Sequence, residues 1–300
     1  MSDPGVRRRA GVIGTGAMGL GMARSLVRAG FDTVTRDLRQ DADARAAAVG
    51  ARVLPSAAAV ARHAGVVFVV VVDDREVDDV LFAADGIASA GAGTTVFVSS
   101  TLDPAFVRGL VPRAAGRGLV IVDAPISGGP AKAADGSMTM MLAGPEPTLA
   151  ALAPVVAAVA ARRYIVSERP GDAAATKIVN NLLAGANLAA AGEALALADA
   201  LGLDAAATAQ VINASSGASW IFADRVPRAL AGDFAPRAAT RILTKDLAIA
   251  RAVAERAGAP SAFAHAAHRA FGDAVGAGYG EDDDAAIVRR ARELAATRRR

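Results

Sequence analysis

Residues 11–26, GVIGTGAMGLGMARSL, determine the fold expected for this chain. A short apolar run ends at Gly14, and the pattern Gly14-x-Gly16-x-x-Gly19 leads into a segment of helical length. In a dinucleotide-binding unit the first glycine makes a tight turn and the second lets the backbone approach a pyrophosphate. The third permits close packing of helix on strand. Because strand, turn and helix follow in the required order, we expect a nucleotide cofactor at this turn.

The neighbouring residues predict how that cofactor is held. The first N–H groups of the helix, those of Ala17 and Met18, are placed to bind the pyrophosphate. Asp37 closes the second strand-like run, where an acidic residue accepts hydrogen bonds from the ribose hydroxyls and repels a 2′-phosphate. That favours NAD. Arg36 and Arg39 flank the carboxylate and could bind the extra phosphate, so NADP stays as the alternative.

The first half of the chain alternates short apolar runs with helical patterns. Helices are expected at 17–29 and 103–116, between Val- and Ile-rich runs that suit strands buried on both faces of a parallel sheet. The expected strands are 10–14, 33–37, 66–72, 94–100, 119–125, 137–144 and 162–167. Strands alternating with helices predict an α/β, doubly wound Rossmann-type domain.

After about residue 168 the strand pattern stops. Residues 171–202 read as one long helix rich in Ala and Leu, and further Ala-rich helical patterns follow. We therefore expect two domains, a cofactor-binding domain at 1–168 and an all-helical domain at 169–300 that the long helix opens. The acidic run EDDD (281–284) is expected to cap a following helix.

Composition excludes several functional classes. The chain has no cysteine, 4% aromatic residues and a formal charge of only +3, which argues against thiol chemistry and nucleic-acid binding. The longest apolar run is too short to span a bilayer, and glycines interrupt the apolar stretch near the start, unlike a signal peptide. We expect a cytoplasmic protein with no membrane partner. His265 and His268 lie three positions apart with no third ligand evident, so no metal site is expected.

Lysine is rare here, with only Lys132, Lys177 and Lys245 among 33 basic residues. Arginine keeps its proton in proteins, whereas a desolvated lysine can lose it and act as a base. Lys177 stands near the start of the long helix, and Asn181 lies four residues on, hence on the same helical face. An amine and an amide one helical turn apart can together hold the two oxygens of a hydroxy acid. Lys132 is given no role.

Four segments make the chain resemble the β-hydroxyacid dehydrogenase family, which includes 3-hydroxyisobutyrate and L-threonate dehydrogenases. They are GVIGTGAMG (11–19), DAPISGGPAKAADGSMTMM (123–141), GDAAATKIVNN (171–181) and TKDLAIA (244–250). Segments 215–225, 232–237 and 277–286 resemble the L-threonate branch more closely. Asn181 departs from that branch, which replaces this asparagine, and leaves 3-hydroxyisobutyrate open as a substrate.

The resemblance implies a role for each matching residue. Lys177 would be the general acid/base and Asn181 would orient the substrate. The carboxylate would be held by a hydroxyl and two backbone N–H groups, those of Ser127, Gly128 and Gly129. Thr101 and Lys245 would contact the nicotinamide side of the cofactor, with Asp246 positioning Lys245.

The expected activity is NAD-dependent oxidation of a small hydroxy carboxylate, in the cleft between two domains of a homodimer or homotetramer. Two alternatives remain at this point. One is an imine reductase on the same architecture, and the other is a catalytically silent NAD-binding sensor. Chains of either kind usually lack a lysine at the position of Lys177.

Overall fold

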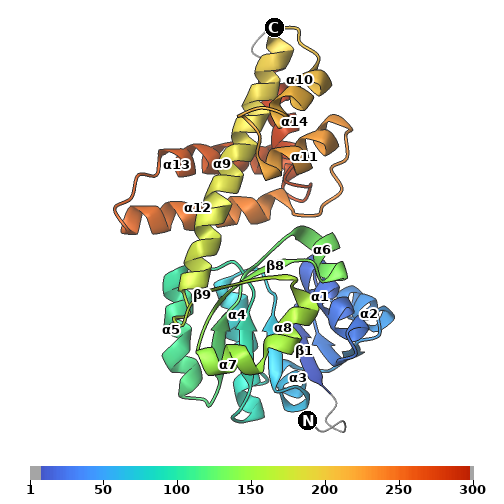
Figure 1. The fold of residues 1–300 in the computed structure, drawn as a ribbon, viewed down its shortest axis with the longest axis vertical. Helices are drawn as coiled ribbons and strands as arrows, with labels where there is room; N and C mark the ends of the chain where they lie inside the picture. The colour runs from blue at the N-terminus through green and yellow to red at the C-terminus, as the bar shows by residue number, and fades with distance from the viewer. Residues whose placement is uncertain (1–7, 298–300) are drawn as a thin grey trace. The chain divides into compact units, whose positions relative to one another are not determined.

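The computed structural model describes residues 8–297 (Figure 1). The expectation about the start of the chain falls largely on residues 1–7, outside the described part. Contacts divide the chain between Lys177 and Ile178 into two compact units, which are described separately below. The predicted domain boundary at residues 168 and 169 stays a proposal.

The N-terminal unit is built on one mixed sheet in the order β3-β2-β1-β4-β5-β6-β8-β7, with β9 also paired to β8. The first six strands in that order are parallel, β8 is antiparallel to β6 and β7, and β9 is parallel to β8. The strands are β1 (Arg9–Ile13), β2 (Asp32–Arg36), β3 (Arg52–Val53), β4 (Val66–Val69), β5 (Thr95–Val98), β6 (Val120–Asp123), β7 (Ile126–Ser127), β8 (Thr139–Ala143) and β9 (Arg162–Ser167).

Register aligns the carboxyl ends of the parallel strands. Ile13 pairs with Arg36 on one side and with Val69 on the other, and Val98 pairs with Asp123. The turn residues that follow β1, β2, β4, β5 and β6 therefore leave the sheet at one edge. In doubly wound sheets this is the edge where ligands bind.

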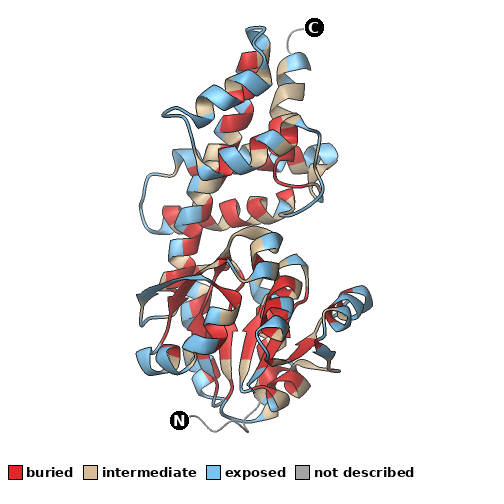
Figure 2. Ribbon diagram, turned by 45° about the vertical axis from the view of Figure 1, so that its right-hand side comes forward, coloured by how far each residue is buried: buried red, intermediate tan, exposed pale blue. Residues whose placement is uncertain are grey.

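Helices cover both faces of the sheet, as the pattern predicts. Phe68 and Phe97 pack on one face with ring centroids 4.9 Å apart, in a core shared with α1. Val67 and Val96 point to the other face, into a core shared with α3, α4 and α5. Figure 2 shows buried residues running along these strands. The helical segments are α1 (Ala17–Arg28), α2 (Gln40–Ala48), α3 (Ala57–His63), α4 (Asp74–Phe82), η1 (Ile87–Ala90), α5 (Pro104–Ala115), α6 (Gly129–Asp135), α7 (Glu146–Ala151) and α8 (Ala153–Val159).

Some strand bounds differ from those expected. The run 66–72 leaves the sheet after Val69, because the N–H of Val71 donates to Ser100 Oγ at 3.1 Å instead of to a strand. The two-residue strands β3 and β7 were not predicted, since so short a run carries no periodic pattern.

The second unit is helical, as expected. The long helix α9 is continuous over Asp172–Ala200, so its first six residues belong to the first unit and the rest to the second. Among residues 8–297, α9 is the one helix long and apolar enough to cross a membrane by length and composition. Core helices pass the same test, and 44% of its most apolar window is buried. The remaining helices are α10 (Ala205–Asn213), α11 (Trp220–Leu230), α12 (Thr240–Arg256), α13 (Ala262–Ala274), η2 (Val275–Tyr279) and α14 (Ala286–Thr297).

A buried ion network ties α11 to the segment before α14. Arg225 pairs with Asp284, and Arg228 Nη2 lies 3.0 Å from Oδ1 of Asp283, which is fully buried. Asp283 also accepts hydrogen bonds from the N–H groups of Arg237 (2.9 Å), Ala238 and Ala285. Asp283 thus fixes the residue just before α14, and the expected cap of that helix stays a prediction. The burial of Asp283 among arginines is a finding that the sequence pattern does not predict.

The two aspartates of this network differ in the direction of their pKa change. Burial raises the pKa of Asp284 to about 6, although the charge and hydrogen bond of Arg225 oppose the change. For Asp283, burial also acts to raise the pKa, but the Arg237 N–H and the Arg228 side chain outweigh it and hold the pKa below its usual value. Two adjacent carboxyls are thereby driven in opposite directions.

Candidate active site

The glycine turn after β1 has the geometry that the motif predicts. Gly14 has φ +88°, a conformation that disfavours a side chain, and its N–H donates to Arg36 O at 2.9 Å. A Cβ on Gly19 would lie 1.9 Å from Gly14 O, so helix and strand approach too closely for any other residue. A Cβ on Gly16 would meet only Arg39 Nη2, at 3.8 Å. Space therefore remains over Gly16 for a bound pyrophosphate, and these residues fit a dinucleotide.

Asp37 is held rigidly beside this turn. Its Oδ2 accepts the N–H of Thr15 at 2.7 Å, and its Oδ1 accepts the N–H of Arg39 at 2.9 Å. Burial acts to raise the pKa of Asp37, but the hydrogen bonds from Arg39 and Thr15 outweigh it and lower the pKa below its usual value. Asp37 is thus a fixed anion. Arg36 is paired with Asp43 at 3.1 Å, so part of its hydrogen-bonding capacity is already used.

A second backbone turn follows β7 at Ser127. Gly128 and Gly129 have φ +136° and +79°, and Gly128 is the N-cap of α6. Successive N–H groups in such conformations form a concave nest for an anion. α6 packs directly on α1, where the buried Ser25 Oγ donates to Ala133 O at 2.8 Å. The helix behind the phosphate turn and the helix behind the nest are therefore locked together.

Lys177 lies near the start of α9, with only 7% of its surface exposed. Two positions of the preceding turn are held by Asp123, the last residue of β6. Asp123 Oδ2 accepts the N–H groups of Gly171 (2.7 Å) and Ala174 (2.9 Å). Burial raises the pKa of Asp123 to about 6, against the lowering effect of the hydrogen bonds from Ala174 and Gly171. A buried amine thus stands one turn beyond a buried carboxyl.

Within the helical unit, Asp246 connects Asn181 and Lys245. Asn181 Nδ2 donates to Asp246 Oδ2 at 2.7 Å, and Lys245 Nζ lies 3.0 Å from Asp246 Oδ1. Since a carboxylate only accepts, Asn181 must turn its NH₂ group toward Asp246. Asn181 Oδ1 accepts from Asn180 Nδ2 at 3.0 Å and keeps a second lone pair. Asn181 therefore presents an acceptor, suited to a substrate hydroxyl.

The predicted residues thus fall into separate groups. The glycine turn and Asp37 lie together, and so do Asn181, Lys245 and Asp246. Thr101, half-buried, follows β5 at the same sheet edge as the glycine turn. Sequence reasoning assigned no role to Asp123 or Ser100. Ser100 joins the ends of β4 and β5, because its Oγ donates to Val71 O at 2.7 Å.

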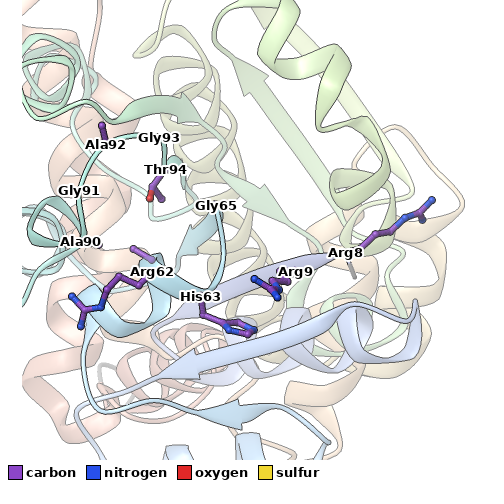
Figure 3. A pocket seen from close by; sticks show the side chains of 11 residues that line it. Arg8, Arg9, Arg62, His63, Gly65, Ala90, Gly91, Ala92, Gly93 and Thr94 are labelled. Carbon is purple, nitrogen blue, oxygen red and sulfur yellow. The ribbon is translucent and has the colours of Figure 1, made fainter. Parts of the chain in front are cut away.

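A cavity of about 540 Å³ lies at the opposite, amino ends of the strands. Figure 3 shows Arg9 and His63 side by side there, while the guanidinium groups of Arg8 and Arg62 point away from each other. His63 Nε2 lies 2.9 Å from Asp32 Oδ2. The basic groups do not converge, so this cavity is not the candidate active site. Within residues 8–297, no group of three or more acidic, His or Cys residues is placed to hold a metal ion.

Comparison with known families covers nearly the whole chain. Residues 9–167 match the model for the NAD binding domain of 6-phosphogluconate dehydrogenase. Residues 171–291 match the model described as NAD-binding of NADP-dependent 3-hydroxyisobutyrate dehydrogenase. The N-terminal unit is therefore an NAD-binding domain, as its glycine turn indicates.

The chain is also similar to individual proteins over most of its length. L-threonate dehydrogenase from Cupriavidus necator is 42% identical over 283 residues, which cover 94% of this chain and 95% of that protein. The crystal structure of 3-hydroxyisobutyrate dehydrogenase from Salmonella typhimurium has a TM-score of 0.87 at 38% identity and covers 94% of this chain and 99% of that one. An imine reductase from Pseudomonas sp. has a TM-score of 0.63 at 20% identity, covering 95% of this chain and 99% of that one, and shows a shared fold alone.

Proposed function

Because the chain belongs to the 3-hydroxyisobutyrate dehydrogenase-like family of hydroxy-acid dehydrogenases, we propose that it oxidises a small hydroxy carboxylate with NAD, with Lys177 exchanging the hydroxyl proton. The observation that carries the proposal is the burial of Lys177 just past the capped start of α9. Burial disfavours the charged form of an amine, and a neutral amine is the form that accepts a proton.

Each further role uses a group that the chain already orients. The hydroxyl of Ser127 and the N–H groups of Gly128 and Gly129 hold the substrate carboxylate without any charged side chain. Asn181 accepts from the substrate through Oδ1, because Asp246 fixes the other end of its amide. Lys245, which is paired with Asp246, is assigned to the cofactor by the family resemblance, as is Thr101.

NAD supplies the hydride acceptor for the carbinol carbon. The chain's part is to release the hydroxyl proton to Lys177 Nζ while the carboxylate stays fixed, so that the carbon–oxygen bond gains double-bond character without charge on the oxygen. In the reverse direction the protonated Lys177 returns the proton. Holding the carboxylate and the hydroxyl together orients the carbon that loses hydride. Such positioning of a reacting atom increases the rate.

L-threonate is the proposed substrate, with 3-hydroxyisobutyrate as the second candidate. The first choice is supported by the 42% identity to an L-threonate dehydrogenase. The second is supported by the Salmonella relative and by Asn181, which departs from the threonate branch.

NAD is proposed in preference to NADP. The support is Asp37, a fixed anion where a 2′-phosphate would have to lie, and like charges repel. Arg39 Nε lies 3.3 Å from the same carboxylate, so its charge is partly compensated by Asp37.

The two alternatives are less well supported. Imine reductases share only the fold with this chain. A silent sensor does not require a buried lysine near the start of α9. A homodimer or homotetramer also stays a proposal. It is supported by the exposed side chains of Leu183, Leu197 and Leu201 along and just beyond α9, and light scattering would count the chains.

The test is NADH appearance at 340 nm with NAD or NADP over L-threonate, D-threonate, 3-hydroxyisobutyrate, glycerate and 3-hydroxypropionate. We expect the highest rate with L-threonate and NAD. Lys177→Ala should lower that rate by at least about 1000-fold, while NADH affinity stays within about threefold. If Lys177→Ala keeps a tenth of the rate, the acid/base assignment is wrong. Silence across the panel with NADH still bound would favour the sensor or the imine reductase.

A further inference from the structure

We propose that Asp123 is a positioning residue, which aims Lys177 by holding the first turn of α9 against the end of β6. The inference rests on the proposed function, in which Lys177 exchanges the hydroxyl proton. Asp123 has 1% of its surface exposed and reaches its two partners across 48 and 51 positions of the chain. A polar group that is so deeply buried and bonds residues so distant in the sequence is a specific connection between two elements.

The contact restrains the helix in two ways. The first N–H groups of a helix lack partners within it, and a carboxylate is the strongest side-chain acceptor for them. One oxygen, Asp123 Oδ2, accepts from both Gly171 and Ala174, so the first turn can neither rotate nor slide without losing a bond. Ala174 is buried in the core formed by the strand valines, which fixes the same turn from its apolar side.

Lys177 takes its position from that turn. It lies three residues after Ala174, within one helical turn of 3.6 residues, so both side chains face the same way. A rotation of the first turn would therefore carry Lys177 Nζ off the line to the substrate hydroxyl. A displacement of roughly 1 Å at a reacting group can lower a rate about 100-fold.

Asp172 provides a matched control, because it is a carboxylate in the same helical turn with a different set of partners. Its oxygens bind side chains, Ser167 Oγ at 2.8 Å, Arg169 Nε at 3.2 Å and Arg108 Nη2 at 3.3 Å. Removing its charge leaves in place the hydrogen bonds that Asp123 accepts from the backbone N–H groups of Gly171 and Ala174. A general need for acidity at the start of α9 would make both carboxylates matter equally.

The experiment measures kcat and KM for the best hydroxy acid, and Kd for NADH by fluorescence. Asp123→Ala should lower kcat about 100-fold while KM and Kd stay within about threefold. Asp123→Asn keeps an acceptor oxygen and should bring kcat back to within about tenfold of the wild type. Asp172→Asn should stay within about threefold. If Asp123→Ala does not fold, Asp123→Glu keeps the charge, displaces the oxygen by one methylene and should lower kcat in the same way.

Two outcomes overturn the positioning role. One is a folded Asp123→Ala or Asp123→Glu protein with kcat within threefold of the wild type. The other is a fall in kcat matched by an equal loss of NADH affinity, since that marks general disruption. The proposed function fails separately, if Lys177→Ala keeps its rate. Should Lys177→Ala be inactive and Asp123→Ala fully active, only the role of Asp123 falls.

Discussion

The two units of this chain fix charge by opposite means. In the proposed function, the N-terminal unit uses backbone N–H groups to hold anions, at the glycine turn after β1 and at the nest before α6. The helical unit pairs Arg225 and Arg228 with buried aspartates, and backbone N–H groups add to the hold on one of these, Asp283. A backbone N–H group is held by the fold and can still bind a ligand. The two side chains of an ion pair already use their hydrogen-bonding groups on each other. The first arrangement suits binding and the second suits architecture.

The largest effect expected from this contrast is on the helical unit. Asp283→Ala removes the acceptor for three backbone N–H groups and takes from Arg228 its nearer charged partner, leaving Asp224 at 3.5 Å, which should destabilise the unit by about 3–5 kcal/mol. Trp220, the single tryptophan of the chain, lies in this unit, so its fluorescence during denaturant unfolding reports the loss.

Asp282→Ala is the matched control for that change. Its side chain is 39% exposed and lies 3.9 Å from Arg289, so it should cost less than about 1 kcal/mol. Equal losses for Asp282→Ala and Asp283→Ala would contradict the contrast between buried and exposed pairs.

A smaller effect is expected at the glycine turn, where the loss of NADH affinity can be measured separately from any loss of stability. Gly16→Ala has space for its methyl group in the protein, so the free energy of unfolding should not change. The methyl occupies the approach to the pyrophosphate, however, and NADH affinity should fall about 100-fold, or ~3 kcal/mol.

Gly19→Ala should lose stability as well as affinity, because its Cβ would overlap Gly14 O. NADH titration and thermal unfolding of both variants check the pair. A Gly16→Ala protein that binds NADH as the wild type does would show that the backbone does not hold the pyrophosphate there.

The smallest effect tests Asp123, the carboxyl of the N-terminal unit that is buried as deeply as those of the helical unit. Its pKa is raised from 3.8 to about 6, so its contribution to stability is fully present below about pH 3.8 and is lost as the pH rises through 6. Asparagine does not titrate. Between pH 4.5 and 7, Asp123→Asn should therefore gain about 2 kcal/mol relative to the wild type.

Urea unfolding followed by circular dichroism at the two pH values measures this change. Asp172→Asn serves again as the control, and its difference from the wild type should hardly change between pH 4.5 and 7, since both values lie above 3.8. The pKa of Asp172 is lowered, chiefly by its hydrogen bond from Ser167, so its carboxylate contributes stability that is lost as the pH falls. A constant difference between Asp123→Asn and the wild type would show that Asp123 titrates normally.

The sequence could predict the features that depend on local patterns, but not the pairs that join distant positions. The glycine turn, the doubly wound sheet and α9 follow from local patterns of glycines, strand-length apolar runs and a long Ala-rich stretch, and all three were found. Strands β3 and β7 were missed because two residues carry no period. The pairing of Arg225 with Asp284 spans 59 positions, and that of Asn181 with Asp246 spans 65. No local signal marks such partners.

The candidate site shows this division most clearly. Lys177 could be singled out because lysine is rare in this chain, and the nest because its segment resembles the β-hydroxyacid dehydrogenase family. Asp246 was expected to position Lys245, its neighbour in sequence, but its bond to Asn181 depends on how α9 and α12 pack. Asp123 begins a segment that carries the resemblance, but no pattern marks its contacts, since its partners are backbone N–H groups that every residue except proline possesses.

The hydrogen bond from Ser25 to Ala133 has a consequence for how two bound ligands would change each other's affinity. It joins the helix behind the phosphate turn to the helix behind the nest, so an anion that stiffens one helix removes freedom from the other. Thermodynamic linkage then makes the effect mutual. Whatever factor the dinucleotide adds to the affinity for the acid, the acid must add to the affinity for the dinucleotide.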